Sequence, residues 1–243
     1  MLQAKTMCPM ILTDAPPTGL PPLDPQEFLG TRRKMIAALA AAAASTCLPA
    51  FAVAPEWGKS PAGVSGDFWT QPRWVWLKRA GTDEEIKVVY WANGQLITEA
   101  YHQISWFLRD RRFEAMLSAD SPVIAKAERS GRLSAAQKSP WALMDPVVLD
   151  ILYSYSAWLS IYGLSRPLMV TSGFRHFISN ELTEGAALAG WHPKAGAVDF
   201  FIQGVPVEQT ARFGQWLSGG GVGLYPKKNF THVDRGRVRT WKS

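Results

Sequence analysis

The residues of this sequence that are best suited to chemistry are two histidines, each followed by an aspartate. The 243-residue chain contains four histidines. His192 precedes Asp199 in "HPKAGAVD", and His232 precedes Asp234 in "FTHVD". Two imidazoles and one carboxylate form a ligand set for a catalytic zinc ion, whose fourth position holds water. The spacing alone is equally compatible with polar residues at the ends of strands.

The local sequence would allow three of these side chains to converge. Small residues at 195–197 let the chain turn back tightly between His192 and Asp199. His232 and Asp234 are two positions apart on an expected strand and therefore point to the same face. If the two strands pair in antiparallel fashion, His192, Asp199 and His232 meet. Zinc held there would lower the pKa of its water toward about 7 and polarise a carbonyl, as amide hydrolysis requires, and Asp234 would take the water's proton.

The other two histidines lack a partner at a useful spacing. His102 lies in an expected helix beside Tyr101 and Trp106, where we predict a half-buried structural role. His176 follows Arg175 in an expected turn and would at most line a cleft. We therefore leave both histidines out of the metal site.

The elements that must position these residues follow from periodicity and turn signals. Residues 145–163 predict a helix with Asp145 as N-cap and Pro146 at its first position. Further helices are expected at 101–117, 178–190 and 206–218, and strands at 74–91 (two, around "GTDEE"), 166–175, 196–202, 221–225 and 230–234. This pattern favours an α+β fold, with a small antiparallel sheet that carries the zinc site and packs with helices.

The N-terminal segment has the features of an export signal. Arg32 and Arg33 precede an alanine-rich apolar stretch that starts at Met35 and ends in small residues, as in a twin-arginine signal peptide. An uncleaved membrane anchor is the alternative, although Pro49 interrupts the stretch. The export signal predicts a periplasmic protein.

Cleavage of this signal would change the chemistry that is available. Cutting after Ala52 or Ala54 removes Cys8 and Cys47, the two cysteines of the chain. The mature protein then has neither a disulfide nor a thiolate ligand, so a metal must be held by His, Asp or Glu.

Composition favours a folded protein with an anionic partner. Hydrophobic residues make up 47% and charged residues 19%, and eleven tryptophans can fill a core or line a groove for sugars or peptides. The formal charge of +6 fits nucleic acid, a membrane surface or an acidic wall polymer. No run of Lys and Arg has the pattern of a phosphate-binding surface, so we expect no nucleic-acid partner.

Three motifs occur in an order and at spacings that point to a known family: "TSGFR", "HPKAGAVDFFIQG" and "GGVGLYPKKNFTHVDRGRVRTW". With them, residues 80–241 resemble the YcbK/MepK-like murein endopeptidases, a branch of the zinc D-Ala-D-Ala carboxypeptidase superfamily. The resemblance implies that His192, Asp199 and His232 bind Zn²⁺. It also implies that Arg175 acts in catalysis, by holding a substrate carboxylate or the oxyanion. We further expect three residues to contact the substrate: Ser172, Arg175 and Tyr225.

The chain departs from the family pattern without losing a ligand. Gly190 replaces a serine two positions before the first ligand, and Ala195 replaces a glycine. Phe174 and His176 replace a tyrosine and a serine on either side of the arginine. Other branches of the superfamily carry a carboxylate where this chain has Asn229, which leaves Asp234 as the candidate base. These departures concern substrate preference and the base rather than metal binding.

The resulting hypothesis is an exported zinc endopeptidase that cleaves peptide cross-links of peptidoglycan. Its partners would be peptidoglycan peptide stems, with membrane contact only if the signal stays uncleaved, and we expect a monomer. Two alternatives remain: a carboxypeptidase that trims terminal D-alanine, and a non-catalytic wall-binding module of an envelope-spanning machine. The predicted regions are a leader and signal peptide at 1–54, a linker at 55–72 and a zinc peptidase domain at 73–243.

Overall fold

A computed structural model describes residues 66–243 of the chain. The predicted signal peptide and most of the predicted linker lie outside these residues. The end of the expected linker forms a short helix instead, α3 (Gly66–Thr70), in which Phe68 and Trp69 are buried. Phe68 stacks on Tyr153 with ring centroids 4.7 Å apart, which ties α3 to the core. Within 66–243, no helix is long and apolar enough to span a membrane.

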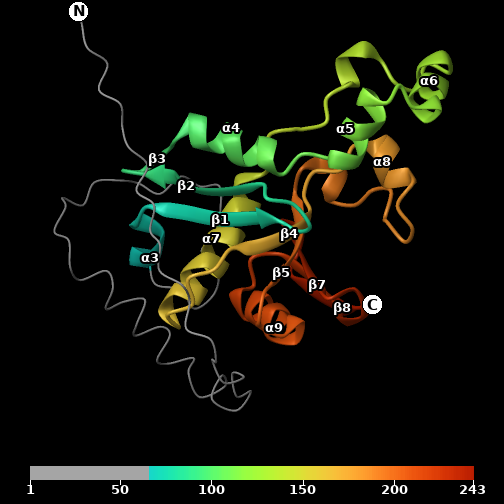
Figure 1. Cartoon of the computed structure of the whole chain (residues 1–243). Coiled ribbons are helices and arrows are strands. Elements are labelled where there is room, and N and C mark those ends of the chain that lie inside the picture. Colours follow the sequence, from blue (N-terminus) through green and yellow to red (C-terminus); the bar gives the residue numbers. More distant parts are fainter. Residues whose placement is uncertain (1–65) are drawn as a thin grey trace, which may run out of the picture.

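The centre of the molecule is an eight-stranded mixed sheet with the order β3-β2-β1-β4-β5-β7-β6-β8 (Figure 1). Its strands are β1 (Arg73–Arg79), β2 (Glu85–Ala92), β3 (Gln95–Leu96), β4 (Leu168–Ser172), β5 (Ala197–Ile202), β6 (Gly221–Tyr225), β7 (Phe230–Asp234) and β8 (Arg239–Lys242).

The α+β class is confirmed, but the expected small antiparallel sheet was wrong. β1 pairs in parallel with β4, and β6 pairs in parallel with β8. The N-terminal hairpin reaches β4 through a long helical crossover, which is the connection that a parallel pair requires. The final strand β8 was not expected, and it extends the sheet beyond β6.

The helices are α4 (Thr98–Phe107), α5 (Arg111–Ser118), α6 (Pro122–Arg129), α7 (Pro146–Ile161), α8 (Phe177–Glu181) and α9 (Val207–Leu217). α7 and α9 contact each other and strands of the sheet, whereas α4 packs against β2. The main core forms between these helices and the sheet and includes Val198 and Phe200 of β5 and Val233 of β7. Because strand side chains alternate, Asp199 and His232 point to the opposite face.

Helix α7 confirms the capping prediction. Asp145 accepts a hydrogen bond from the Val147 amide at 3.0 Å, and Pro146 occupies the first turn. The helix expected at 101–117 is instead two helices, α4 and α5. The break occurs because Asp110 caps the second helix by accepting from the Phe113 amide at 2.9 Å.

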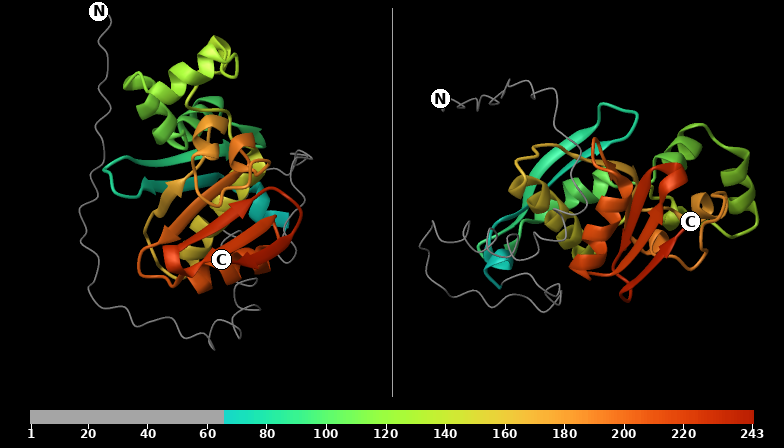
Figure 2. Two further views of the ribbon diagram at one scale, coloured as in Figure 1. Left: turned by 90° about the vertical axis from the view of Figure 1, so that its right-hand side faces the viewer. Right: turned by 90° about the horizontal axis from the view of Figure 1, so that it is seen from below.

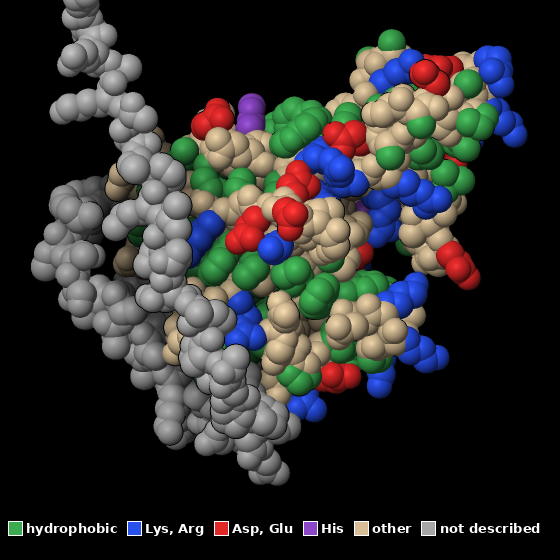
Figure 3. All heavy atoms as spheres, in the orientation of Figure 1, with side chains coloured by type: hydrophobic (Ala, Val, Ile, Leu, Met, Phe, Trp, Pro, Cys, Tyr) green, Lys and Arg blue, Asp and Glu red, His purple; other side chains and the backbone are tan. Residues whose placement is uncertain are grey.

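A small lobe of α5, α6 and α8 projects from one end of the sheet (Figure 1, Figure 2). It has a separate apolar core formed by Phe113, Ile124, Ala127, Leu133 and Ile178. Lysine and arginine side chains are prominent on its surface (Figure 3). The helix expected at 178–190 ends at Glu181, and the chain continues as a loop that leads to the predicted metal site.

Candidate metal centre

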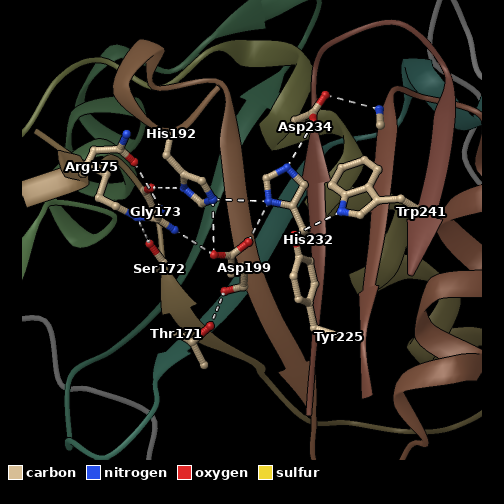
Figure 4. Close-up of polar contacts among 12 residues, drawn as sticks. Thr171, Ser172, Gly173, Arg175, His192, Asp199, Tyr225, His232, Asp234 and Trp241 are labelled. Atoms are coloured by element: carbon tan, nitrogen blue, oxygen red, sulfur yellow. Dashed lines mark hydrogen bonds and ion pairs between the residues drawn. The ribbon is translucent and has the colours of Figure 1, made fainter. Parts of the chain in front are cut away.

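The three predicted ligands meet beside β5 and β7 (Figure 4). Strand alternation places Asp199 and His232 on the face opposite the core residues Val198 and Val233. Asp199 of β5 and His232 of β7 are direct cross-strand neighbours in an antiparallel pair, as the sequence suggested. His192 opens a short 3₁₀ turn, η3 (His192–Lys194), that leads into β5. The predicted convergence of the three side chains is therefore present.

The spacing of the donor atoms suits a small cation. His192 Nε2 lies 3.2 Å from His232 Nδ1 and 3.2 Å from Asp199 Oδ2, and His232 Nδ1 lies 2.7 Å from Asp199 Oδ1. Ligands at ~2.0–2.1 Å from a tetrahedral zinc are about 3.3 Å apart. Two nitrogens and one carboxylate at these separations fit zinc as a donor set.

A backbone carbonyl orients His192. Its Nδ1 donates to the Gly173 carbonyl at 2.6 Å, which leaves Nε2 unprotonated toward the other ligands. Gly173 lies so close to Leu108 that an added Cβ would overlap the Leu108 carbonyl oxygen. The glycine of "TSGFR" is therefore required for this close approach.

A buried carboxylate orients His232 from the side away from the other ligands. His232 Nε2 donates to Asp234 Oδ2 at 3.0 Å, and Asp234 is fully buried. Arg239 donates to both carboxylate oxygens, at 3.0 and 2.7 Å, and the Gly236 amide donates at 2.7 Å. The predicted base thus lies behind a ligand, with its oxygens occupied by protein donors.

The centre concentrates negative charge. Burial would raise the pKa of Asp199, but His192 and His232 hold this pKa far below its ordinary value. Burial would lower the pKa of His232, but hydrogen bonds to Asp199 and Asp234 raise it to about 9. Without a cation, His232 is therefore protonated near neutral pH, and its positive charge is stabilised by the two carboxylates.

Arg175 holds the carboxylate of Asp199 in place. Its Nη2 donates to Asp199 Oδ2 at 3.0 Å, its Nε to Ser172 Oγ at 3.1 Å and its Nη1 to Asn180 Oδ1 at 3.3 Å. A guanidinium has five N–H groups, so two remain for other partners. Arg175 lines the cleft described next, whereas Ser172, a predicted substrate contact, is not one of its lining residues.

A cleft of about 420 Å³ opens over the ligands. The loop at 183–187 and Trp191 contribute to its lining, as do Tyr225, Lys228 and Trp241 from the C-terminal strands and their connecting turn. Trp241 Nε1 donates to the Tyr225 hydroxyl at 3.0 Å, and its ring lies 5.3 Å from that of His232. The predicted contact residue Tyr225 is therefore at the cleft, together with aromatic and basic residues that the sequence reasoning missed.

The remaining histidines lie away from the cleft lining. His102 is exposed rather than half-buried, with its ring 6.1 Å from that of Trp141. His176 is buried and stacks on Phe113 at 3.6 Å, so it does not line the cleft. Residue type alone did not distinguish these two environments.

The region that carries the candidate ligands is similar to a known family of peptidoglycan endopeptidases. Residues 132–241 match the family model described as "Peptidoglycan L,D-endopeptidase MepK". Over these residues the chain is similar to the MepK family. The peptidoglycan L,D-endopeptidase MepK of Escherichia coli (strain K12) is 28% identical over 221 residues, covering 88% of this chain and 99% of that protein. A probable MepK of Haemophilus influenzae is 37% identical over 103 residues, or 41% of this chain and 54% of that protein. No solved structure matches the chain significantly.

The MepK match includes Arg175 and all three candidate ligands. The backbone conformation helps to explain one departure from the family pattern. Ala195 stands where a glycine was expected, and its backbone is left-handed, with φ 54° and ψ 26°. Glycine adopts that conformation without the steric cost that alanine carries. The backbone at the turn before β5 thus has the shape that a glycine favours.

Proposed function

We propose that this chain is a zinc-dependent peptidoglycan endopeptidase that hydrolyses peptide cross-links. The observation that carries the proposal is the convergence of His192, Asp199 and His232 in an open cleft. The match of this region to the MepK family supports it. The cleft leaves room for a peptide over the ligands, which a purely structural metal site would not need.

In this proposal His192 Nε2, His232 Nδ1 and Asp199 hold the zinc ion. When bound, zinc supplies a Lewis acid and lowers the pKa of water. The Gly173 carbonyl and Asp234 keep the two imidazoles in the tautomers that present the correct nitrogens. Arg175 fixes the Asp199 carboxylate through Nη2, and its two remaining N–H groups can meet a substrate carbonyl or carboxylate.

We assign Asp234 a positioning role instead of the role of general base. Its oxygens accept from His232, Arg239 and Gly236, and the side chain has no exposed surface. A base must be within hydrogen-bond reach of the proton that it removes. Asp234 is separated from the shared side of the ligands by the imidazole of His232 (Figure 4).

Digestion of purified cross-linked muropeptide dimers, followed by mass spectrometry, tests the activity. The proposal expects dimers to be split, the splitting to stop with a chelator, and zinc to restore it. His192→Ala and His232→Ala should each abolish it, whereas His102→Ala, on the exposed side of α4, should not.

Other outcomes of this assay would identify the alternatives. Release of terminal D-alanine with intact dimers would indicate a carboxypeptidase. Wall binding by a protein that takes up no zinc would indicate a non-catalytic module. Cleavage retained in either histidine variant would contradict the proposed metal site.

We also propose that the protein is exported to the periplasm by its twin-arginine signal and acts as a monomer. Replacing Arg32 and Arg33 by lysine should leave the full-length precursor in the cytoplasm, as fractionation and immunoblotting would reveal. Normal export of this variant would contradict a twin-arginine route.

A further inference from the structure

The cations that line the cleft differ in whether a protein carboxylate already neutralises them. Arg175 Nη2 lies 3.0 Å from Asp199 Oδ2, and Arg239 Nη2 lies 2.7 Å from Asp234 Oδ2. Lys228 lines the same cleft, and its side chain has no hydrogen bond or ion pair to any residue within 66–243. Of these three cations, Lys228 is the one whose charge remains available to a ligand.

The turn that carries Lys228 is well anchored. Lys228 ends η4 (Pro226–Lys228), which connects β6 to β7. Tyr225 and Phe230 pair across these strands, and their rings stack with centroids 4.4 Å apart. The Tyr225 hydroxyl also accepts from Trp241. The base of the turn is therefore fixed beside the metal centre, while the flexible lysine side chain reaches from it.

The carboxylates of the cleft do not satisfy this charge. Asp199 and Asp234 accept from the residues described above, and both belong to the metal centre. Glu184 lies on the loop that contributes the other wall, and no ion pair joins it to Lys228. A lysine ammonium is a compact charge that pairs with carboxylates. Peptide stems end in free carboxylates, so the proposed substrate carries a matching group.

We propose that Lys228 determines specificity by binding a free carboxylate of the peptide stem near the bond that is cut. This inference rests on the proposed function and defines its substrate class as cross-linked peptides with a free carboxylate. Amidation of that carboxylate removes the charge and should remove the contribution of Lys228.

Lys227 provides a matched control. Both lysines are exposed residues of η4, but Lys227 does not line the cleft. For a dimer with a free carboxylate, Lys228→Ala should lower kcat/KM about threefold to tenfold, mainly through KM, because it removes one partly solvated charged contact. Lys227→Ala should change it less than twofold. Lys228→Arg should recover most of the loss.

The amidated dimer completes the test. Wild type and Lys228→Ala should cleave it with equal kcat/KM. Equal losses in the two alanine variants, or a loss for Lys228→Ala that persists with the amidated dimer, would overturn the inference.

If the wild type cleaves no dimer, the proposed function fails, and the inference is then judged by binding. Equilibrium titration with the free and amidated stem peptides should show that Lys228→Ala weakens binding of the free-carboxylate form alone. Unchanged binding would contradict the role of Lys228 independently of catalysis.

Discussion

Asp234 illustrates how a carboxylate can orient a proposed metal ligand without itself being one of the proposed ligands. It receives hydrogen bonds from His232, from Nη1 and Nη2 of Arg239 and from two backbone amides. Burial alone would raise the pKa of Asp234, but these donors hold this pKa well below its ordinary value. A carboxylate fixed in this way keeps the His232 ring oriented and increases its basicity as a ligand.

Asp234→Asn should therefore weaken metal binding more than it slows chemistry. Zinc affinity is expected to fall about 10- to 100-fold, because the amide neither carries the charge nor accepts as strongly from His232. At saturating zinc, kcat should stay within about tenfold of wild type. Chelator competition would measure the affinity, and dimer cleavage at saturating zinc would measure kcat.

The alternative role for Asp234 gives a different result. Loss of a general base typically costs about 10²- to 10⁴-fold in rate, even with the metal site full. A loss of that size with unchanged zinc affinity would restore Asp234 as the base.

The convergence of His192, Asp199 and His232 could be predicted from the sequence, but the second hydrogen bond that each imidazole makes could not. Residue type and alternation on β5 and β7 brought Asp199 and His232 to one face, as expected. The position of Asp234 behind His232 depends on the rotation of an imidazole and on Arg239, which β8 supplies. Because β8 was not expected, its contribution to the centre could not be anticipated.

At the scale of elements, ion pairs join the β1–β2 turn to residues 108–109, the segment after α4 that contacts the strand β4 end of the site. Glu84, at the β1–β2 turn, accepts from Arg79 Nε and from Arg109 Nη1, each at 2.6 Å. Both arginines are buried. Burial would raise the pKa of Glu84, but these two arginines lower it. Arg109 follows Leu108, whose carbonyl accepts from the Phe174 amide at 2.8 Å.

Glu84→Gln should destabilise the fold by about 2 kcal/mol, because it leaves the buried guanidinium of Arg79 without a carboxylate partner and that of Arg109 with Glu114 alone. Asp83→Asn, at the exposed neighbouring position, should change the free energy of unfolding by less than about 0.5 kcal/mol. Denaturant unfolding of both variants would measure the difference. Equal, small effects would show that the arginines are satisfied by their other acceptors.

Local signals predicted elements well where one cap and one apolar pattern agreed, as in α7. The same signals failed where two amphipathic helices, α4 and α5, follow each other directly in the sequence. The apolar spacing of 101–117 continues through the break between α4 and α5, which depends on Asp110 also accepting from the His176 amide, 2.8 Å away. That contact joins residues 66 positions apart, so no local pattern contains it.

At the scale of the whole molecule, the ring of His176 packs between α5 and α8 within the helical lobe, next to Arg175 of the site. Its Nε2 donates to the Gln137 carbonyl at 3.0 Å, and its Nδ1 accepts from the Ile178 amide at 3.3 Å. The imidazole stacks on Phe113, also contacts Phe177, and has Asp110 as its charged neighbour. These contacts require the neutral imidazole, because protonated Nδ1 could not accept.

The stability of the protein should therefore fall in mild acid through His176. Burial lowers its pKa, and this effect exceeds the opposing effects of Gln137 and Asp110. The unfolded chain, with a histidine pKa of about 6.5, then binds more protons than the folded chain. The stabilisation is complete above that pH and is lost as the pH falls from about 6.5 toward the lower folded pKa.

His176→Asn isolates this contribution, because asparagine can still cap α8 but does not titrate. The variant should be less stable than wild type at pH 7.5, since it loses the ring stacking. The difference should shrink as the pH falls to 5, because only wild type gains the cost of protonating a buried imidazole. Urea unfolding of both proteins across this range measures the difference, which cancels the titration of the carboxylates and of the metal ligands. A difference that stays constant with pH would show that the lobe is held by packing alone.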